Sequence, residues 1–250
     1  MLIYFYCFCF SKLNPCIIPH FFNETDRPTI VKRRYIESDY FTKMLEVYDM
    51  DEKELPAELS NKIGSFLMER AKDFDLVLVA DFGHGAITTG IIDMLCKHAR
   101  FLAINTQANA GNRGFHTVTR YPHANYVCIA EHEIRLEARD ARGELRPMVE
   151  RIRAKLQANC MVVTRGRQGC VVCTEREYAI IPAVAKKVVD RVGAGDALLA
   201  ITSLAAAQNV PFEVLGFIGN VVGAEAVEMI GNEKAIDKLK VKKHIVSLLK

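Results

Sequence analysis

The 250-residue sequence has little net charge and contains no internal repeat or low-complexity segment. Its formal net charge is +3, and no basic run is interleaved with aromatic residues. Nucleic acids and anionic membranes select strongly basic surfaces, so we expect neither as a partner. Half of the residues are hydrophobic and a quarter are charged, which is typical of a globular domain with a substantial core.

Long hydrophobic runs are also missing. Residues 1–10 are aromatic and apolar, but the run is too short to span a bilayer before Lys12 and Pro15 interrupt it. It lacks the basic start and the small-residue cleavage site of a signal peptide. We therefore interpret residues 1–27 as an atypical N-terminal segment and residues 28–250 as the folded domain.

The eight cysteines do not form a disulfide framework in a chain of this length. Cys170 and Cys173 have Cys-x-x-Cys spacing, but no second ligand pair is nearby and the sequence Cys-Val-Val-Cys is typical of a strand. We expect buried, reduced thiols and a cytoplasmic location. A zinc or redox site at this pair is the minor alternative.

Short apolar runs alternate with segments of helical periodicity along most of the chain. Residues 39–48 are mixed in character, so we predict neither a helix nor a strand there. This alternation predicts an α/β fold, a parallel sheet with helices on both faces. The expected strands are 28–36, 76–80, 101–104, 126–129, 161–164, 170–173 and 178–181, and the expected helices are 56–72, 87–98, 146–157, a segment after 196, 212–230 and a basic C-terminal helix.

A turn of small residues, Gly193-Ala194-Gly195-Asp196, joins a β-branched run to a helix rich in Ala and Leu. The glycines allow turn conformations, and the free N–H groups at a helix start favour an anion such as a phosphate. Asp196 would lie beside that anion, where it could take a proton from a hydroxyl. The alternative is an ordinary helix start with a favourable first-turn acid.

A second glycine pattern leaves open an oxidoreductase with a dinucleotide-binding fold. Gly83-x-Gly85 follows the expected strand 76–80, but Thr88 replaces the third glycine and Asn105 stands where an acid should bind a ribose hydroxyl. Because two requirements fail, this function is the less favoured one. No Walker A sequence is present.

The Gly-Ala-Gly-Asp motif after a Val-Asp pair resembles the signature of the PfkB family of ribokinase-like sugar kinases. The resemblance implies a three-layer α/β/α fold, ATP and Mg²⁺, Asp196 as the catalytic base and residues 193–195 as the anion hole. Arg191 and Val192 depart from it, because many members have small hydroxyl residues there.

Two further segments resemble the nucleotide site of this family. Thr164, Gly166 and Gly169 match the segment along the phosphates, and Arg165 or Arg167 could offset phosphate charge. The alternative is a hairpin turn with exposed arginines. On the helix at 212–230, Asn220 matches a position near the adenine, although a buried Asn can equally bind backbone.

The metal motif of the family is altered here. Glu131 or Glu133 could order water around Mg²⁺, which keeps several waters and takes few protein carboxylates. The alternative for each acid is a solvated helix start, where the helix dipole favours a negative charge.

The loop from Asp81 to Gly85 resembles that of kinases for D-glycero-D-manno-heptose 7-phosphate, which are often fused to or paired with a nucleotidyltransferase. This resemblance places Asp81, Gly85 and Asn105 on the side of the sugar, with His84 as either a phosphate contact or a solvated loop histidine. Asn105 stands where relatives often have Asp.

The early strands and the Asn/Gly-Gly sugar motif of the family have no counterpart before Pro28. We therefore expect a quarter to a third of the family domain to be absent. The resemblance implies an ATP-dependent kinase of a sugar or sugar phosphate and leaves a homodimer open. The alternative is a nucleotide-binding module without catalysis.

Overall fold

The computed structural model describes residues 16–23, 29–37, 43–51, 53–109, 111–112, 114–230 and 234–250. The apolar run at residues 1–10, on which the interpretation of an atypical N-terminal segment rests, lies outside the described residues.

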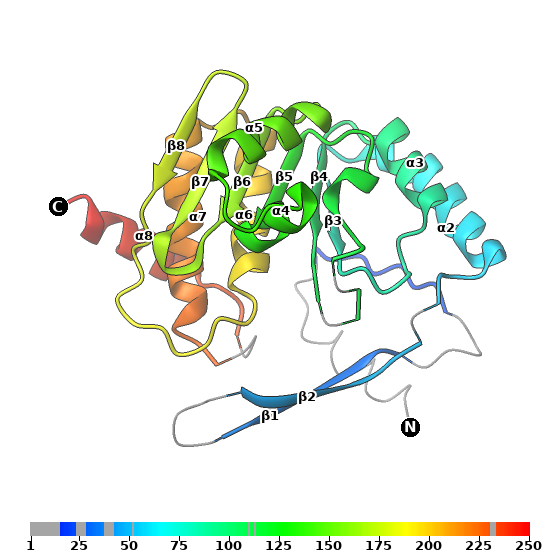
Figure 1. Ribbon diagram of the computed structural model, residues 1–250, viewed down its shortest axis with the longest axis horizontal. Coiled ribbons are helices and arrows are strands. Elements are labelled where there is room, and N and C mark those ends of the chain that lie inside the picture. Colours follow the sequence, from blue (N-terminus) through cyan, green and yellow to red (C-terminus); the bar gives the residue numbers. More distant parts are fainter. Residues whose placement is uncertain are drawn as a thin grey trace.

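A six-stranded sheet forms the centre of the molecule (Figure 1). The order of the strands in space is their order in the chain. The first four are parallel, and the last two join antiparallel, so the sheet is mostly parallel as expected. The strands are β3 (Val77–Asp81), β4 (Leu102–Thr106), β5 (Tyr126–Ala130), β6 (Cys160–Thr164), β7 (Cys170–Thr174) and β8 (Tyr178–Ile181).

Helices cover both faces of this sheet, which gives three layers (Figure 1). One face packs against α3, α4 and α5, with α2 beside α3, and the other face packs against α6 and α7. The helices are α2 (Ala57–Arg70), α3 (Thr89–His98), α4 (Glu131–Ala138), α5 (Leu145–Lys155), α6 (Ala194–Ala207), α7 (Phe212–Val227) and α8 (Lys238–Leu248), with short 3-10 turns at Ala71–Asp73, Val118–Arg120 and Gly166–Gln168.

Alternate side chains of the strands fill two cores, because successive residues of a strand point to opposite faces. Val127 and Ile129 pack under α3–α5, whereas Tyr126 and Cys128 pack under α6 and α7. The hydroxyl group of Tyr126 donates to Thr202 Oγ1 of α6 at 2.6 Å, so the second core also contains a satisfied polar pair.

The Cys-x-x-Cys pair lies on β7 with its thiols in different cores. Cys173 belongs to the core under α3–α5 and Cys170 to the core under α6 and α7. Burial raises the pKa of the Cys170 thiol to about 12. Both residues are therefore small core side chains, and no group of three or more potential metal ligands occurs among the described residues.

A separate antiparallel hairpin, β1 (Val31–Ile36) and β2 (Lys43–Asp49), lies outside the sheet (Figure 1). The mixed segment 39–48 therefore contains most of a strand that the sequence did not predict. Met44, Leu45 and Val47 are all exposed, so the strand has no buried face and shows no alternation. The ammonium group of Lys32 lies 5.6 Å from the ring centre of Phe82, at the carboxyl end of β3.

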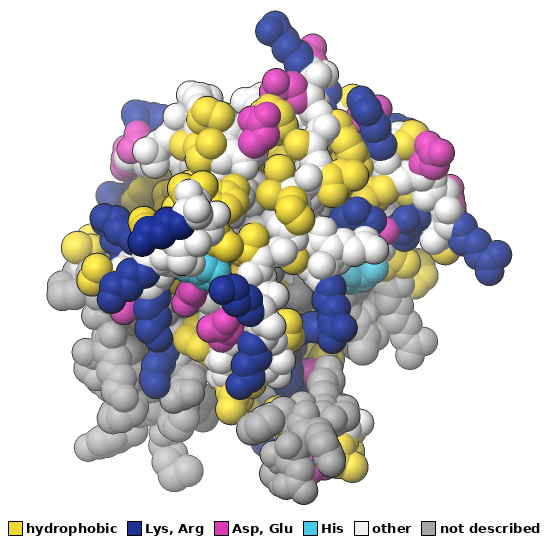
Figure 2. Space-filling view, turned by 90° about the vertical axis from the view of Figure 1, so that its left-hand side faces the viewer, with side chains coloured by type: hydrophobic (Ala, Val, Ile, Leu, Met, Phe, Trp, Pro, Cys, Tyr) yellow, Lys and Arg dark blue, Asp and Glu magenta, His cyan; other side chains and the backbone are white. Residues whose placement is uncertain are grey.

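The basic C-terminal helix α8 packs on α7, where His244 Nδ1 lies 2.8 Å from Glu225 Oε1. Lys and Arg side chains lie among hydrophobic ones on the face of the molecule seen in Figure 2. Within the described ranges, no helix combines the length and apolar character needed to cross a membrane.

Candidate functional site

The small-residue turn adopts the conformation that its glycine predicts. Gly193 is the N-cap of α6 with φ 81° and ψ −8°, a left-handed conformation that favours glycine. The preceding segment is fixed by Val189 N and Asp190 N, which donate to Val227 O at 2.8 and 3.1 Å. The first N–H groups of α6 are thus held in one orientation at the positive end of the helix dipole.

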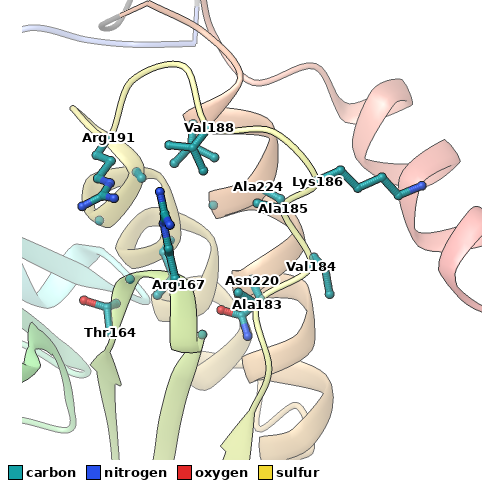
Figure 3. Close-up of a pocket in the computed structure, with 17 residues that line it drawn as sticks. Thr164, Arg167, Ala183, Val184, Ala185, Lys186, Val188, Arg191, Asn220 and Ala224 are labelled. Carbon is teal, nitrogen blue, oxygen red and sulfur yellow. The ribbon is translucent and has the colours of Figure 1, made fainter. Parts of the chain in front are cut away.

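A cavity of about 560 Å³ lies beside this helix start (Figure 3). Its walls come from the end of β6 and the turn that follows, the linker after β8, the first residues of α6, and α7. The lining residues are Thr164, Gly166, Arg167, Gly169, Ala183, Val184, Ala185, Lys186, Val188, Arg191, Ala194, Gly195, Leu198, Asn220, Gly223, Ala224 and Val227.

Three of the lining glycines face open space. A Cβ atom added to Gly166, Gly195 or Gly223 would have no heavy atom of its surroundings within 4 Å. A side chain at these positions would therefore project into space that a ligand can use. Gly169 differs, because its φ is +83° and a Cβ would lie 2.0 Å from Ile181 O, so it is needed for the fold itself.

Asp196 is exposed beside the cavity in the first turn of α6. Within the described residues its carboxylate has no hydrogen bond and no ion pair. Surrounding protein atoms partly desolvate the carboxyl group and raise its pKa above the ordinary value. A carboxylate that is unpaired and raised in pKa is suited to act as a general base.

Asn220 lies on α7 and is almost fully buried. Its Nδ2 donates to Ile181 O and to Pro182 O, both at 3.0 Å. Of the two partners that the sequence left open, a base or the backbone, the amide binds the backbone. Asn220 thereby fixes the linker after β8, which forms one wall of the cavity.

The two arginines of the segment after β6 point in different directions. Arg165 Nε donates to Glu131 Oε2 at 2.8 Å on α4, whereas Arg167 lines the cavity, as Thr164 does. Of these two arginines, only Arg167 is placed to offset ligand charge in the cavity.

Both acids considered for Mg²⁺ have partners within the protein. Glu131 binds Arg165 and Arg135, and these hydrogen bonds outweigh burial and lower the pKa of its carboxyl group. Burial raises the pKa of Glu133, whose two oxygens accept Ala130 N at 2.7 Å and Ala108 N at 2.9 Å. Glu131 is therefore ion-paired at the start of α4, whereas Glu133 is buried there and differs from the solvated acid of the alternative.

The residues expected on the sugar side serve the fold. Asp81 is 2% exposed and accepts from His116 Nε2 at 2.7 Å and from the Tyr121 hydroxyl at 2.8 Å. Burial opposes its ionisation, but the hydrogen bonds from His116, Tyr121 and Gly83 outweigh it and lower the pKa. An enclosed carboxylate with these partners is not exposed to a substrate, which differs from the expectation for Asp81.

Gly85 and Asn105 are likewise bound within the protein. Gly85 has φ +80°, and its Cβ would lie 2.4 Å from Lys53 O. Asn105 Nδ2 donates to Cys128 O at 2.7 Å, so its side chain links β4 to β5. His84 is buried, which contradicts the alternative of a solvated loop histidine.

Sequence reasoning missed the linker from Ala183 to Val188, which contributes a whole wall of the cavity. The linker carries no periodicity and no motif, so only its position between a strand and the Gly-Ala-Gly-Asp turn could have indicated its role. It also missed His116 and Tyr121, which are far from Asp81 in the sequence.

A comparison with family models matches residues 68–239 to the pfkB family of carbohydrate kinases. The matched segment makes up most of the chain and contains the cavity residues and Asp196. The chain belongs to the PfkB family. The family indicated by the Gly-Ala-Gly-Asp motif is thereby confirmed.

Curated relatives are distant and longer. The bifunctional protein HldE of Geotalea uraniireducens (strain Rf4) is 26% identical over 215 residues, which cover 84% of this chain and 43% of that protein. The bifunctional protein HldE of Campylobacter curvus (strain 525.92) is 24% identical over 220 residues, 85% of this chain and 44% of that protein. This PfkB chain thus spans less than half the length of these relatives.

Solved structures show the same fold. Phosphofructokinase-2 from Escherichia coli in complex with fructose-6-phosphate matches with a TM-score of 0.69 at 14% identity, over 88% of this chain and 70% of that one. Ribokinase from Thermotoga maritima matches with a TM-score of 0.68 at 16% identity and the same coverage. The chain therefore has the ribokinase-like α/β fold that the resemblance implied.

Proposed function

We propose that this PfkB chain transfers the γ-phosphoryl group of ATP to a hydroxyl of a sugar or sugar phosphate, with Asp196 as the base. The observation that carries the proposal is the unpaired carboxylate of Asp196 beside a cavity whose wall includes Gly195 and the start of α6. A helix start binds phosphate, and the adjacent carboxylate is free to face an alcohol.

The cavity fits a nucleotide in size and in the character of its walls. Drug-sized ligands occupy pockets of about 300–1,000 Å³, and this cavity measures about 560 Å³. Ala183, Val184 and Ala224 provide apolar surface for a base, while Gly195 at the start of α6 faces open space in the same cavity. We assign Mg²⁺ no side-chain ligand, since bound ATP would carry the ion on its phosphates.

In the proposed reaction, Asp196 takes the proton from the acceptor hydroxyl while the hydroxyl oxygen attacks the γ-phosphorus of ATP. The bond from that phosphorus to the β–γ bridging oxygen breaks, and ADP leaves. The backbone amides of residues 193–195 stabilise negative charge on the phosphoryl group during its transfer. Positioning and electrostatic stabilisation dominate phosphoryl transfer. In this proposal the chain itself supplies fixed amides for the phosphoryl group and an unpaired carboxylate for the proton.

For the acceptor we propose a heptose 7-phosphate, because the distant relatives are HldE proteins. We further propose residues 28–250 as the kinase unit and a cytoplasmic location, which the free thiols of the described cysteines favour. We also propose a nucleotidyltransferase partner, because relatives are named bifunctional. We propose self-association as a homodimer, because a structure of phosphofructokinase-2 is described as a tetrameric inhibited form and so shows that a protein of this fold can self-associate.

The test is ADP release by the purified chain with MgATP and a panel of sugars and sugar phosphates, including heptose 7-phosphate. Asp196→Asn should lower turnover about 100- to 10,000-fold, the usual contribution of a general base, and should still bind ATP in calorimetry. Asp93→Asn, at an exposed position on α3, is the matched control. Turnover by Asp196→Asn at the wild-type rate would remove this residue from its role.

The second candidate function is nucleotide binding without catalysis. It is favoured by the hydrogen bonds that engage Asp81 and Asn105 within the protein, which leave the acceptor side without an assigned side chain. The same measurements separate the two functions, since a module would bind ATP and transfer no phosphoryl group to any acceptor of the panel. Binding of NAD instead of ATP would favour the dinucleotide-binding oxidoreductase.

A further inference from the structure

The charged side chains that line the cavity are all positive. Arg167, Lys186 and Arg191 are among the lining residues, whereas no Asp or Glu of the described chain is. Asp196 lies beside the cavity but is not among the lining residues, so the lining itself is positively charged and attractive to a negatively charged ligand. Net charge does not explain this feature, because the whole chain carries only +3.

Two of these cations come from different walls of the cavity. Arg167 belongs to the turn after β6 and Arg191 to the linker before α6, and both line the cavity (Figure 3). Lys186 extends away from them toward α8 in the same view. Two guanidinium groups from separate segments are thus available to one ligand.

Neither guanidinium group is engaged elsewhere in the described chain. Arg165, a neighbour of Arg167 in the chain, binds Glu131 at 2.8 Å, but the side chains of Arg167 and Arg191 have no ion pair and no hydrogen bond among the described residues. Both residues are exposed, so their guanidinium groups are accessible to a ligand in the cavity. A bound anion gains charge-assisted hydrogen bonds from them.

We infer that Arg167 and Arg191 form a clamp on the polyphosphate of the nucleotide. The clamp lies at one end of the cavity, and the apolar residues Ala183, Val184 and Ala224 lie at the other, which orients the nucleotide with its phosphates toward α6 (Figure 3). This inference rests on the proposed function. It adds that affinity for the nucleotide comes chiefly from its second and third phosphates.

The test compares the binding of ATP, ADP, AMP and adenosine by calorimetry to the wild type, Arg191→Met, Arg167→Met and Lys97→Met. We expect each arginine variant to bind ATP about 10- to 100-fold more weakly, the effect of losing hydrogen bonds to a charged group, with adenosine binding unchanged. Lys97→Met removes the same charge from an exposed side chain on α3 that does not line the cavity, and it should behave as wild type. Arg191→Lys should be intermediate, because it keeps the charge and loses the bidentate geometry.

Three outcomes would overturn the inference of an arginine clamp. Equal losses for ATP and adenosine, or ATP binding at the wild-type level in both arginine variants, would overturn the clamp and leave the proposed function intact. A wild type that binds none of the four compounds would overturn both. Thermal unfolding confirms that each variant is folded, and Arg167→Lys and Arg191→Lys serve in the comparison if a Met variant is not.

Discussion

Replacing Gly195 with Ala should make the protein slightly more stable and much less active. Gly195 is the second residue of α6, its φ is not in the left-handed region, and no surrounding heavy atom lies within 4 Å of the position of its Cβ. Ala in a helix is favoured over Gly by about 0.5–1 kcal/mol. For a chain of this size that gain raises Tm by about 1–4 °C.

The activity should change in the opposite direction. The new methyl group projects into the cavity beside the amides that we assign to the phosphoryl group. It displaces the phosphate from these donors, and the loss of one such donor typically costs about 100- to 1,000-fold in kcat. A more stable protein with a turnover reduced this far cannot be explained by unfolding.

Gly90→Ala is the matched control. Gly90 is also the second residue of its helix, α3, and its Cβ would meet only Thr88 Oγ1, at 4.0 Å. It lines none of the cavity, so the variant should gain stability and keep wild-type turnover. Thermal unfolding and ADP release measure the two effects. Wild-type turnover by Gly195→Ala would refute the assignment of these amides to the phosphate.

Three further substitutions test the roles of acids. Because the pKa of Asp196 is raised in the folded protein, its charge costs stability above that pKa, so Asp196→Asn should raise Tm at neutral pH and the difference should vanish in acid. Asp81→Asn should cost about 1–3 kcal/mol in urea unfolding, since His116 and Tyr121 lose a buried acceptor. The wild-type advantage should fall as pH falls through the lowered pKa of Asp81. Glu131→Gln should leave the Mg²⁺ dependence of turnover unchanged, and a higher Mg²⁺ requirement would return Glu131 to a metal role.

The sheet and its helices could be predicted because burial imposes a pattern on the sequence. The strands at 76–80, 126–129 and 161–164 are apolar on both faces, and the structure finds them within one or two residues. The hairpin strand Lys43–Asp49 escaped prediction for the opposite reason, since exposure of its hydrophobic residues removes the alternation. The antiparallel direction of β7 and β8 is set by short connections rather than by the residues in the strands.

The turn at residues 193–196 could be recognised because glycine, a helix start and an acid each have a local physical meaning. The roles of Asp81, Asn105 and Glu133 could not, because each is decided by partners distant in the chain: His116 and Tyr121, Cys128 O, and the backbone at Ala108. A polar residue after a strand looks the same in the sequence whether it binds a ligand or closes a loop.

Every described residue that lines the cavity falls between Thr164 and Val227. The loops at the ends of β3 and β4, by contrast, are joined to one another by Gln107 N, which donates to Asp81 O, and by Asn109, and to α4 through Glu133. The proposed site of the phosphoryl donor is thus encoded by one uninterrupted stretch of the chain. Substitutions before Thr164 therefore leave the residues of every described wall of that proposed site unchanged.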